Sequence, residues 1–117
     1  MRARRRDYFE PSEDQITDAV VEHWRTFGTA GSLVASIPNK RAFGQAGLMP
    51  GMPDLVVLSM KLGDKAGFIE LKREHGGRVS EAQRSVGRLM QILHVPYALC
   101  WGRDEPIDQL RAWGAIR

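Results

Sequence analysis

The chain has 117 residues, of which 43% are hydrophobic and 26% are charged. This length fits one domain with a modest core and is too short for two. The composition is that of a globular protein and excludes the disordered, collagen-like and membrane-spanning classes, since no apolar run approaches the ~20 residues that a spanning helix needs. The basic start, Met1 to Arg6, has no hydrophobic stretch behind it, so we expect neither a secretory signal nor a membrane partner.

The net charge of +3 is concentrated at the start of the chain. Four of the 17 basic residues are Arg2, Arg4, Arg5 and Arg6, which leaves 13 basic against 14 acidic residues in the rest. Affinity for nucleic acid would therefore come from this arm, from local patches or from a bound metal. We divide the chain into a basic arm, residues 1–11, and a single domain, residues 12–117. The arm fits a DNA-contacting segment and a disordered tail equally well.

The single cysteine, Cys100, has no cysteine partner for an internal disulfide. A reducing, cytoplasmic setting is the simpler interpretation, and Cys100 is expected in the core.

The first expected element is a helix that starts near Ser12, because Ser12-Glu13-Asp14-Gln15 fits a capping box. Gly28 is expected to end it as the C′ residue. Glu13 falls on the inward face of this helix, where it is either a helix-dipole residue or an extra ligand to a central metal. The expected inward positions are Ile16, Ala19, Val20, His23, Trp24 and Phe27.

Three strands follow in the middle of the chain. A short one over Leu33 to Ile37 is ended by Pro38. The glycine-containing loop of residues 39–53, with Lys40 and Arg41, suits either the close approach of a phosphate backbone or a simple connector. The runs 55–60 and 67–72 then predict a hairpin.

A second capping box, Ser80-Glu81-Ala82-Gln83, predicts another helix. A strand over Tyr97 to Trp101 and a helix from about Asp104 complete an α/β fold of order α-β-β-β-α-β-α, with a mixed central sheet flanked by helices. The second helix is expected to bury Ala82, Val86, Leu89, Met90 and Leu93, and the last to turn Ile107, Leu110 and Trp113 inward.

The hairpin carries the candidate chemistry. Asp54 enters at the base of one strand, and Glu70 and Lys72 share a face of the other, while Ile69 and Leu71 point into the opposite layer. Two carboxylates and the backbone carbonyl of Leu71 are ligands that Mg²⁺ or Mn²⁺ accepts, and Lys72 could orient or deprotonate a water. The alternative is a turn aspartate beside an exposed Glu70–Lys72 pair worth under ~1 kcal/mol.

In this combination and order, the sequence resembles the virus-type replication-repair nuclease (VRR-NUC) domain of the PD-(D/E)xK nuclease superfamily. The resemblance covers nearly the whole chain and implies a restriction-endonuclease-like core. It implies that Asp54 and Glu70 are metal ligands, that Lys72 is the catalytic lysine, that Glu13 is an acid approaching the metal, and that Gln83 is the glutamine on the helix after the motif. A capping role for Gln83 explains that residue equally well. The segments that carry the resemblance are Ser12-Glu13-Asp14-Gln15, Ile37-Pro38-Asn39, Gly51-Met52-Pro53-Asp54-Leu55, Phe68-Ile69-Glu70-Leu71-Lys72 and Ser80-Glu81-Ala82-Gln83.

The resemblance also implies an activity, a metal-dependent DNA endonuclease that leaves 5′ phosphates and 3′ hydroxyls. The short chain is similar to stand-alone phage or prophage forms, which resemble homodimeric resolvases of four-way (Holliday) junctions, working in the cytoplasm of a bacterial or phage-infected cell. A flap or nicking nuclease and a non-catalytic DNA-binding module are the alternatives. Tyr97, Trp101 and Trp113 are candidates for the dimer surface or for the core. The residues expected to contact branched DNA are Lys40, Arg41, Arg73, Arg84 and Arg88.

Overall fold

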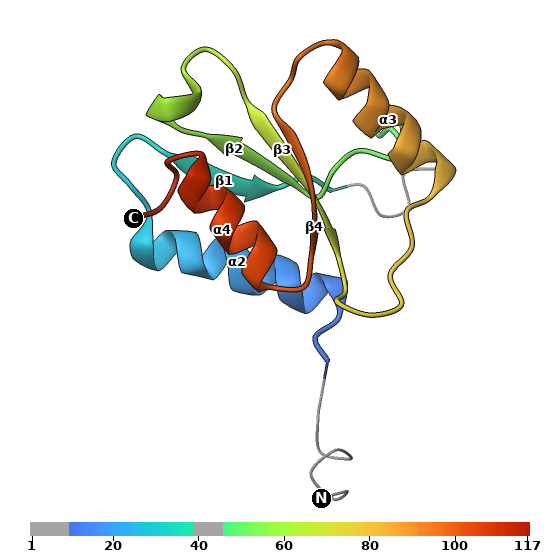
Figure 1. Cartoon of the computed structure of the whole chain (residues 1–117), viewed down its shortest axis with the longest axis horizontal. Helices are drawn as coiled ribbons and strands as arrows, with labels where there is room; N and C mark the ends of the chain where they lie inside the picture. Colours follow the sequence, from blue (N-terminus) through green and yellow to red (C-terminus); the bar gives the residue numbers. More distant parts are fainter. Residues whose placement is uncertain (1–9, 39–45) are drawn as a thin grey trace, which may run out of the picture.

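A computed structural model describes residues 10–38 and 46–117 (Figure 1). The expected order of helices and strands is confirmed, with a short 3-10 helix, η1, added in the hairpin connection. Most of the basic arm, as well as Lys40 and Arg41, lies outside the described residues. The elements are α2 (Glu13–Phe27), β1 (Leu33–Ser36), β2 (Leu55–Leu58), η1 (Met60–Leu62), β3 (Gly67–Lys72), α3 (Glu81–Ile92), β4 (Tyr97–Trp101) and α4 (Asp104–Ala112).

The four strands form one mixed sheet in the order β1-β2-β3-β4. The predicted hairpin is confirmed, since β2 and β3 pair antiparallel with Leu55 opposite Ile69, and β1 pairs antiparallel with the other side of β2. The last pair, β3 with β4, is parallel and places Glu70 beside Leu99. Parallel neighbours need a crossover connection, and here α3 supplies it.

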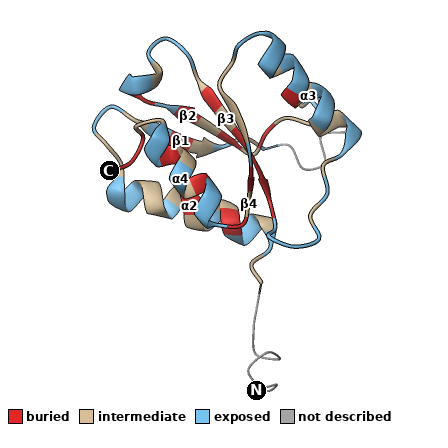
Figure 2. Ribbon diagram, in the orientation of Figure 1, coloured by how far each residue is buried: buried red, intermediate tan, exposed pale blue. Residues whose placement is uncertain are grey.

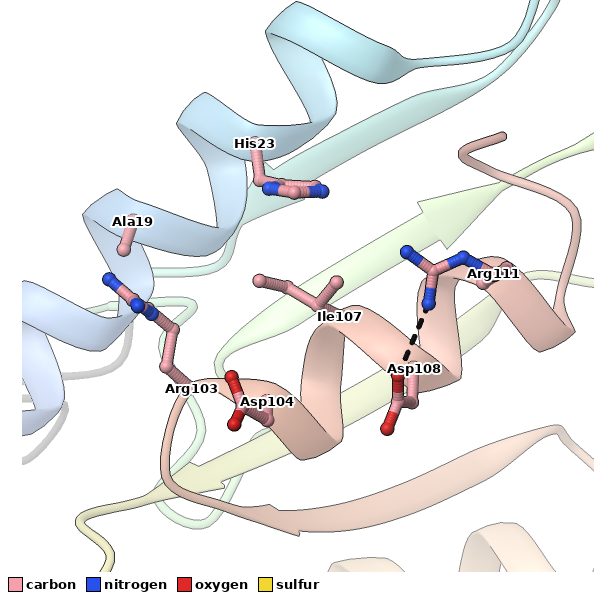
Figure 3. A pocket seen from close by; sticks show the side chains of 7 residues that line it. All are labelled: Ala19, His23, Arg103, Asp104, Ile107, Asp108 and Arg111. Carbon is pink, nitrogen blue, oxygen red and sulfur yellow. Dashed lines mark hydrogen bonds and ion pairs between the residues drawn. The ribbon is translucent and has the colours of Figure 1, made fainter.

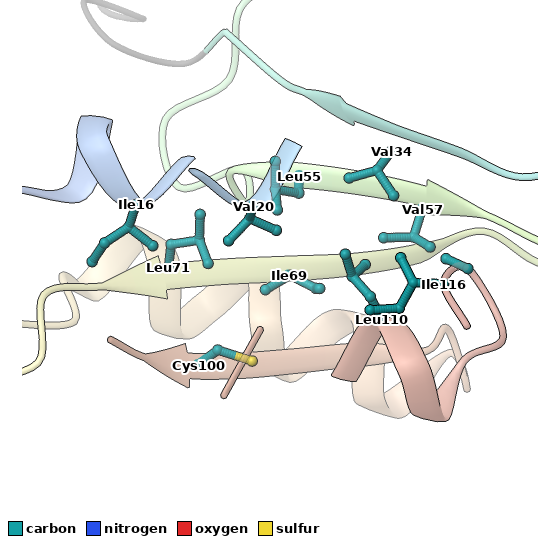
Figure 4. Close-up of a cluster of buried hydrophobic side chains, with 11 residues drawn as sticks. Ile16, Val20, Val34, Leu55, Val57, Ile69, Leu71, Cys100, Leu110 and Ile116 are labelled. Atoms are coloured by element: carbon teal, nitrogen blue, oxygen red, sulfur yellow. The ribbon is translucent and has the colours of Figure 1, made fainter. Parts of the chain in front are cut away.

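Helices cover both faces of this sheet. The core lies between one face and the pair α2 and α4, where Ile16, Leu110 and Ile69 are almost completely buried (Figures 2 and 4). Because successive residues of a strand point to opposite faces, Glu70 and Lys72 turn away from this core. They turn toward α3, which Figure 1 shows apart from α2 and α4. The sheet therefore separates an apolar layer from a polar one.

Two predicted helix faces need correction. On α3, Leu89 and Leu93 are 54% and 61% exposed, whereas Gly87 is the buried residue. The reason is that α3 approaches β4 through Gly87, where an added Cβ would lie 2.9 Å from the Tyr97 ring. On α2, Phe27 is exposed, and its ring packs on His23 with ring centroids 4.7 Å apart.

Both capping boxes are present, at Ser12 and Ser80. Gly28 follows the last residue of α2 as expected, but it is extended, with φ −63° and ψ 148°, and pairs with Ile116 as an isolated bridge. Cys100 is buried as predicted, and Trp113 packs at the edge of the core. No helix within the described residues is long and apolar enough to cross a membrane.

Candidate active site

The backbone of Asp54 is held between two strands. Its N–H donates to the carbonyl oxygen of Ile69 at 3.0 Å, and its carbonyl oxygen accepts from the N–H of Ile37 at 2.8 Å. The carboxylate oxygen Oδ2 accepts from the N–H of Leu71 at 2.7 Å. Asp54 is thus more than a turn residue, because its carboxylate faces the end of β3.

Glu70 and Lys72 are buried, and the alternative of an exposed ion pair is wrong. Their residue exposures are 1% and 3%. The distance from Glu70 Oε2 to Lys72 Nζ is 3.5 Å, and Asp54 lies close enough for its charge to affect Glu70. The predicted convergence of two carboxylates and one amine is confirmed.

Gln83 joins this group from the first turn of α3. Its Nε2 donates to Glu70 Oε2 at 2.9 Å, and its Oε1 accepts from Lys72 Nζ at 2.8 Å. The same Oε1 accepts from the N–H of Ser80 at 2.9 Å, and the Gln83 N–H donates to Ser80 Oγ at 3.1 Å. The capping role of Gln83 is therefore confirmed, and the same side chain also contacts the charged pair, while its role in catalysis stays a prediction.

The electrostatics of Glu70 favour a cation. Burial, followed by the negative charge of Asp54, raises the pKa of the Glu70 carboxyl to about 8, although Lys72 opposes the shift. Glu70 Oε1 is buried and has no hydrogen-bond partner among the described residues. A buried carboxylate oxygen without a partner is costly, and a hard divalent ion would satisfy it.

Leu71 completes an oxygen donor set. In an antiparallel strand the N–H and the C=O of one residue point to the same side. The N–H of Leu71 points to Asp54, so its carbonyl oxygen faces that side as well. The two carboxylates and this carbonyl are oxygen donors of the kind that Mg²⁺ or Mn²⁺ accepts.

Glu13 does not join the two other acids. The described part of the chain contains no group of three or more His, Cys, Asp or Glu side chains that could hold a metal ion. Glu13 instead occupies the first turn of α2, directly after the capping residue Ser12. An acid in this place interacts favourably with the helix dipole, which was the alternative interpretation.

Of the arginines expected to contact DNA, the three that lie within the described residues, Arg73, Arg84 and Arg88, are exposed. Arg84 and Arg88 line a pocket of about 370 Å³ between α3 and β4, together with Gln83 and Tyr97. Burial, and then the charges of Glu70 and Asp54, raise the pKa of the Tyr97 hydroxyl, so Tyr97 lies near the site. Arg73 is in the loop after β3, where its Nη2 donates to the Gly76 carbonyl oxygen at 3.3 Å.

A contact that the sequence did not reveal lies beside this loop. The N–H of His75 donates to Glu10 Oε2 at 2.8 Å, and this bond lowers the pKa of the Glu10 carboxyl. It fixes the point where residue 10 enters the domain, next to the strand that carries Lys72. No local pattern signals this contact, because the two residues are 65 positions apart.

A mixed sheet with helices on both faces, and with an acid, a Glu-x-Lys pair and a helix glutamine at one end, defines a restriction-endonuclease-like fold. Two solved structures with this fold are VRR-NUC domains. The first, described as "VRR_NUC domain protein", has a TM-score of 0.73 and 17% sequence identity, over 91% of this chain and 90% of that chain. The second, described as "VRR_NUC domain", has a TM-score of 0.59 and 18% identity, over 86% of this chain and 94% of that chain.

No family model matches the sequence, and no curated protein matches it. What the chain shares with the two structures is the fold. The resemblance to the VRR-NUC domain is thus confirmed at the level of the fold, and it extends over nearly the whole chain.

Proposed function

We propose that this protein is a metal-dependent endonuclease that hydrolyses phosphodiester bonds in DNA. The observation that carries the proposal is the buried Glu70 Oε1, without a described partner, beside Asp54 and Lys72. A buried carboxylate oxygen without a hydrogen-bond partner destabilises a protein unless a bound ligand interacts with it. The likeness of the fold to VRR-NUC domains supports a nuclease activity for this protein.

Each side chain has a separate role in the proposed reaction. Asp54, Glu70 and the Leu71 carbonyl oxygen would hold Mg²⁺ or Mn²⁺ directly. Within the described part of the chain, Glu13 forms no direct three-acid group with them, so its contact with the ion would be through water. When bound, the ion polarises the scissile phosphate. Lys72 orients the attacking water and offsets the negative charge that grows on the phosphate oxygens.

Gln83 keeps Lys72 and Glu70 in place. Its amide holds the ammonium group through Oε1 and the carboxylate through Nε2. A group fixed in this way needs little reorganisation during the reaction, which is the condition under which electrostatic stabilisation is most effective.

For the substrate we propose four-way junctions, cut by a homodimer whose two sites act on opposed strands. The support is the resemblance of the sequence segments to stand-alone VRR-NUC domains. Arg73, Arg84 and Arg88 would contact phosphates, as would Lys40 and Arg41, and the products would carry 5′ phosphates and 3′ hydroxyls. We place this activity in the cytoplasm, on the basis of the lone Cys100.

The test compares cleavage of four-way, flap and linear DNA by the wild type and by Asp54→Asn, in Mg²⁺, Mn²⁺ or EDTA. Asparagine keeps an oxygen that can accept from the Leu71 N–H, so the fold is spared while the charge is lost. We expect cleavage to need metal and to fall by roughly 10²–10⁴-fold in the variant. Asp64→Asn, in the exposed hairpin connection, is the matched control.

The alternatives give different results. Equal cleavage by wild type and Asp54→Asn would refute the assignment. Faster cleavage of flap DNA than of four-way junctions would make flaps the substrate in place of junctions. Binding of DNA without cleavage would indicate a non-catalytic DNA-binding module. Sedimentation of the protein alone and with junction DNA measures the proposed dimer directly.

A further inference from the structure

The pocket between α3 and β4 has a mixed lining. Gln83, Arg84 and Arg88 line it from the helix, and Tyr97 and Leu99 line it from the strand. Its volume of about 370 Å³ lies in the range of sites for small ligands. It thus combines positive charge with an aromatic surface.

Gly87 lets α3 lie directly against the Tyr97 ring, which covers part of the ring and leaves the rest in the pocket lining. An added Cβ at this position would come within 2.9 Å of the Tyr97 ring, so the absence of a side chain allows the helix to pass close over the tyrosine. Tyr97 is half-buried and Leu99 is 38% exposed. Together they form a partly covered, apolar floor.

The charge of the pocket distinguishes it from two others. The pocket between α2 and α4 contains Asp104 and Asp108, the latter paired with Arg111 at 3.1 Å (Figure 3). The groove between α2 and β1 contains Asp18 and Glu22. The lining of the α3–β4 pocket has arginines and no acid, which favours an anionic ligand.

The pocket adjoins the candidate active site. Gln83 contacts Glu70 and Lys72 with its amide and also lines the pocket. Arg84 lies 3.9 Å from Glu81, but both side chains are exposed, at 55% and 89%, so this ion pair competes weakly with a phosphate. A ligand here would lie beside the scissile phosphate.

We propose that this pocket holds one unpaired nucleotide next to the scissile phosphate, with its base on Tyr97 and Leu99 and its phosphate at Arg84 and Arg88. The inference rests on the proposed function, because the DNA strand must occupy the active site. Stacking on an aromatic side chain stabilises an unpaired base whatever its sequence. A paired base must first be extruded from the duplex, which costs free energy, so the pocket selects DNA that is already unpaired at the cut.

Photocrosslinking tests the position of the nucleotide. The probe is an oligonucleotide with a single 5-iododeoxyuridine, placed either unpaired at a branch point or paired within a duplex arm. Asp54→Asn in EDTA prevents cleavage during irradiation. We expect a crosslink to Tyr97 with the unpaired probe and at least tenfold less with the paired one.

The outcomes separate this inference from the proposed function. Cleavage by the wild type with no crosslink at Tyr97, or with equal crosslinking of both probes, overturns the pocket and leaves the nuclease. A selective crosslink without any cleavage supports the pocket and removes the nuclease. If neither cleavage nor a selective crosslink is observed, both the nuclease function and the nucleotide pocket are refuted.

A pair of variants tests selectivity. Leu99→Glu places a negative charge in the pocket, and Leu89→Glu places the same charge at an exposed position outside its lining. We expect Leu99→Glu to lower the ratio of cleavage of unpaired to fully paired, nicked DNA by about tenfold, which is ~1.4 kcal/mol. Leu89→Glu should leave the ratio unchanged, and an unchanged ratio in a folded Leu99→Glu would contradict the proposal.

Discussion

Substitution of Glu70 by glutamine should stabilise the metal-free protein at alkaline pH. The carboxyl group is almost completely buried, its pKa is raised to about 8, and Oε1 has no hydrogen-bond partner among the described residues. Glutamine keeps the shape of the side chain and an oxygen that can accept from Gln83 Nε2, while it removes the charge. The substitution therefore isolates the cost of ionising this carboxyl inside the fold.

The sign and size of the effect on the free energy of unfolding follow from the pKa values of Glu70 in the unfolded and folded states. A carboxyl group with a pKa of 4.5 when unfolded and about 8 when folded binds its proton more tightly in the folded state. Its contribution to the free energy of unfolding is complete below pH 4.5 and is lost as the pH rises through 8. At ~1.4 kcal/mol per pKa unit, the loss between pH 5 and pH 8 is about 3 kcal/mol.

The assay is urea denaturation of the wild type and Glu70→Gln in EDTA at pH 5 and pH 8. We expect the difference in free energy of unfolding between the two proteins to shift by about 3 kcal/mol in favour of Glu70→Gln between these pH values. Taking the difference between proteins removes the titration of the groups that do not interact with Glu70, and the expected shift belongs to Glu70 together with Asp54 and Lys72. A shift below about 1 kcal/mol would refute the argument that burial and Asp54 oppose the charge on Glu70.

Three further predictions concern the metal, the lysine and the core. Mg²⁺ should raise the melting temperature of the wild type more at pH 8 than at pH 6, because the ion competes with a proton on Glu70, and it should have little effect on Glu70→Gln. Lys72→Met should reduce cleavage by roughly 10²–10⁴-fold while the protein still binds DNA; cleavage at the wild-type rate would exclude Lys72 from the reaction. Leu110→Ala should lower the free energy of unfolding by about 2–5 kcal/mol in denaturant titrations, because Leu110 is a completely buried residue on the inner face of α4; a loss below this range would show that the core collapses around the deletion.

The strand that carries Glu70 and Lys72 was predictable because the rules involved are local. Alternation along β3 places Glu70 and Lys72 on one face whatever surrounds the strand. The spacing of Ser80 and Gln83 likewise predicts a capping box. The burial of Glu70 and Lys72 was harder to predict from the sequence, since it depends on how closely α3 covers the polar face of the sheet.

The sequence-based predictions failed where packing between elements distant in the sequence decides which residues are buried or in contact. The apolar residues of α3 have helical spacing, which predicted that Leu89 faces the sheet. The sequence does not reveal that Gly87 packs against the Tyr97 ring instead and that Leu89 is exposed. Glu13 has the right helical phase, yet its distance from the two other acids depends on where α2 begins relative to β3. The contact of Glu10 with His75 is of the same kind.

The polar face of the sheet links the position of α3 to the assembly of the active site. Gly87 is the buried residue of α3, so this helix buries little apolar surface against the sheet. Gln83, by contrast, is tied to Lys72, Glu70 and Ser80 at once. Because net hydrogen-bond energies rise when a partner is charged, these contacts weigh heavily in placing the first turn of α3. The candidate catalytic residues thus help to hold the helix whose pocket we propose to select the substrate, and a change that moves the helix should change catalysis and selectivity together.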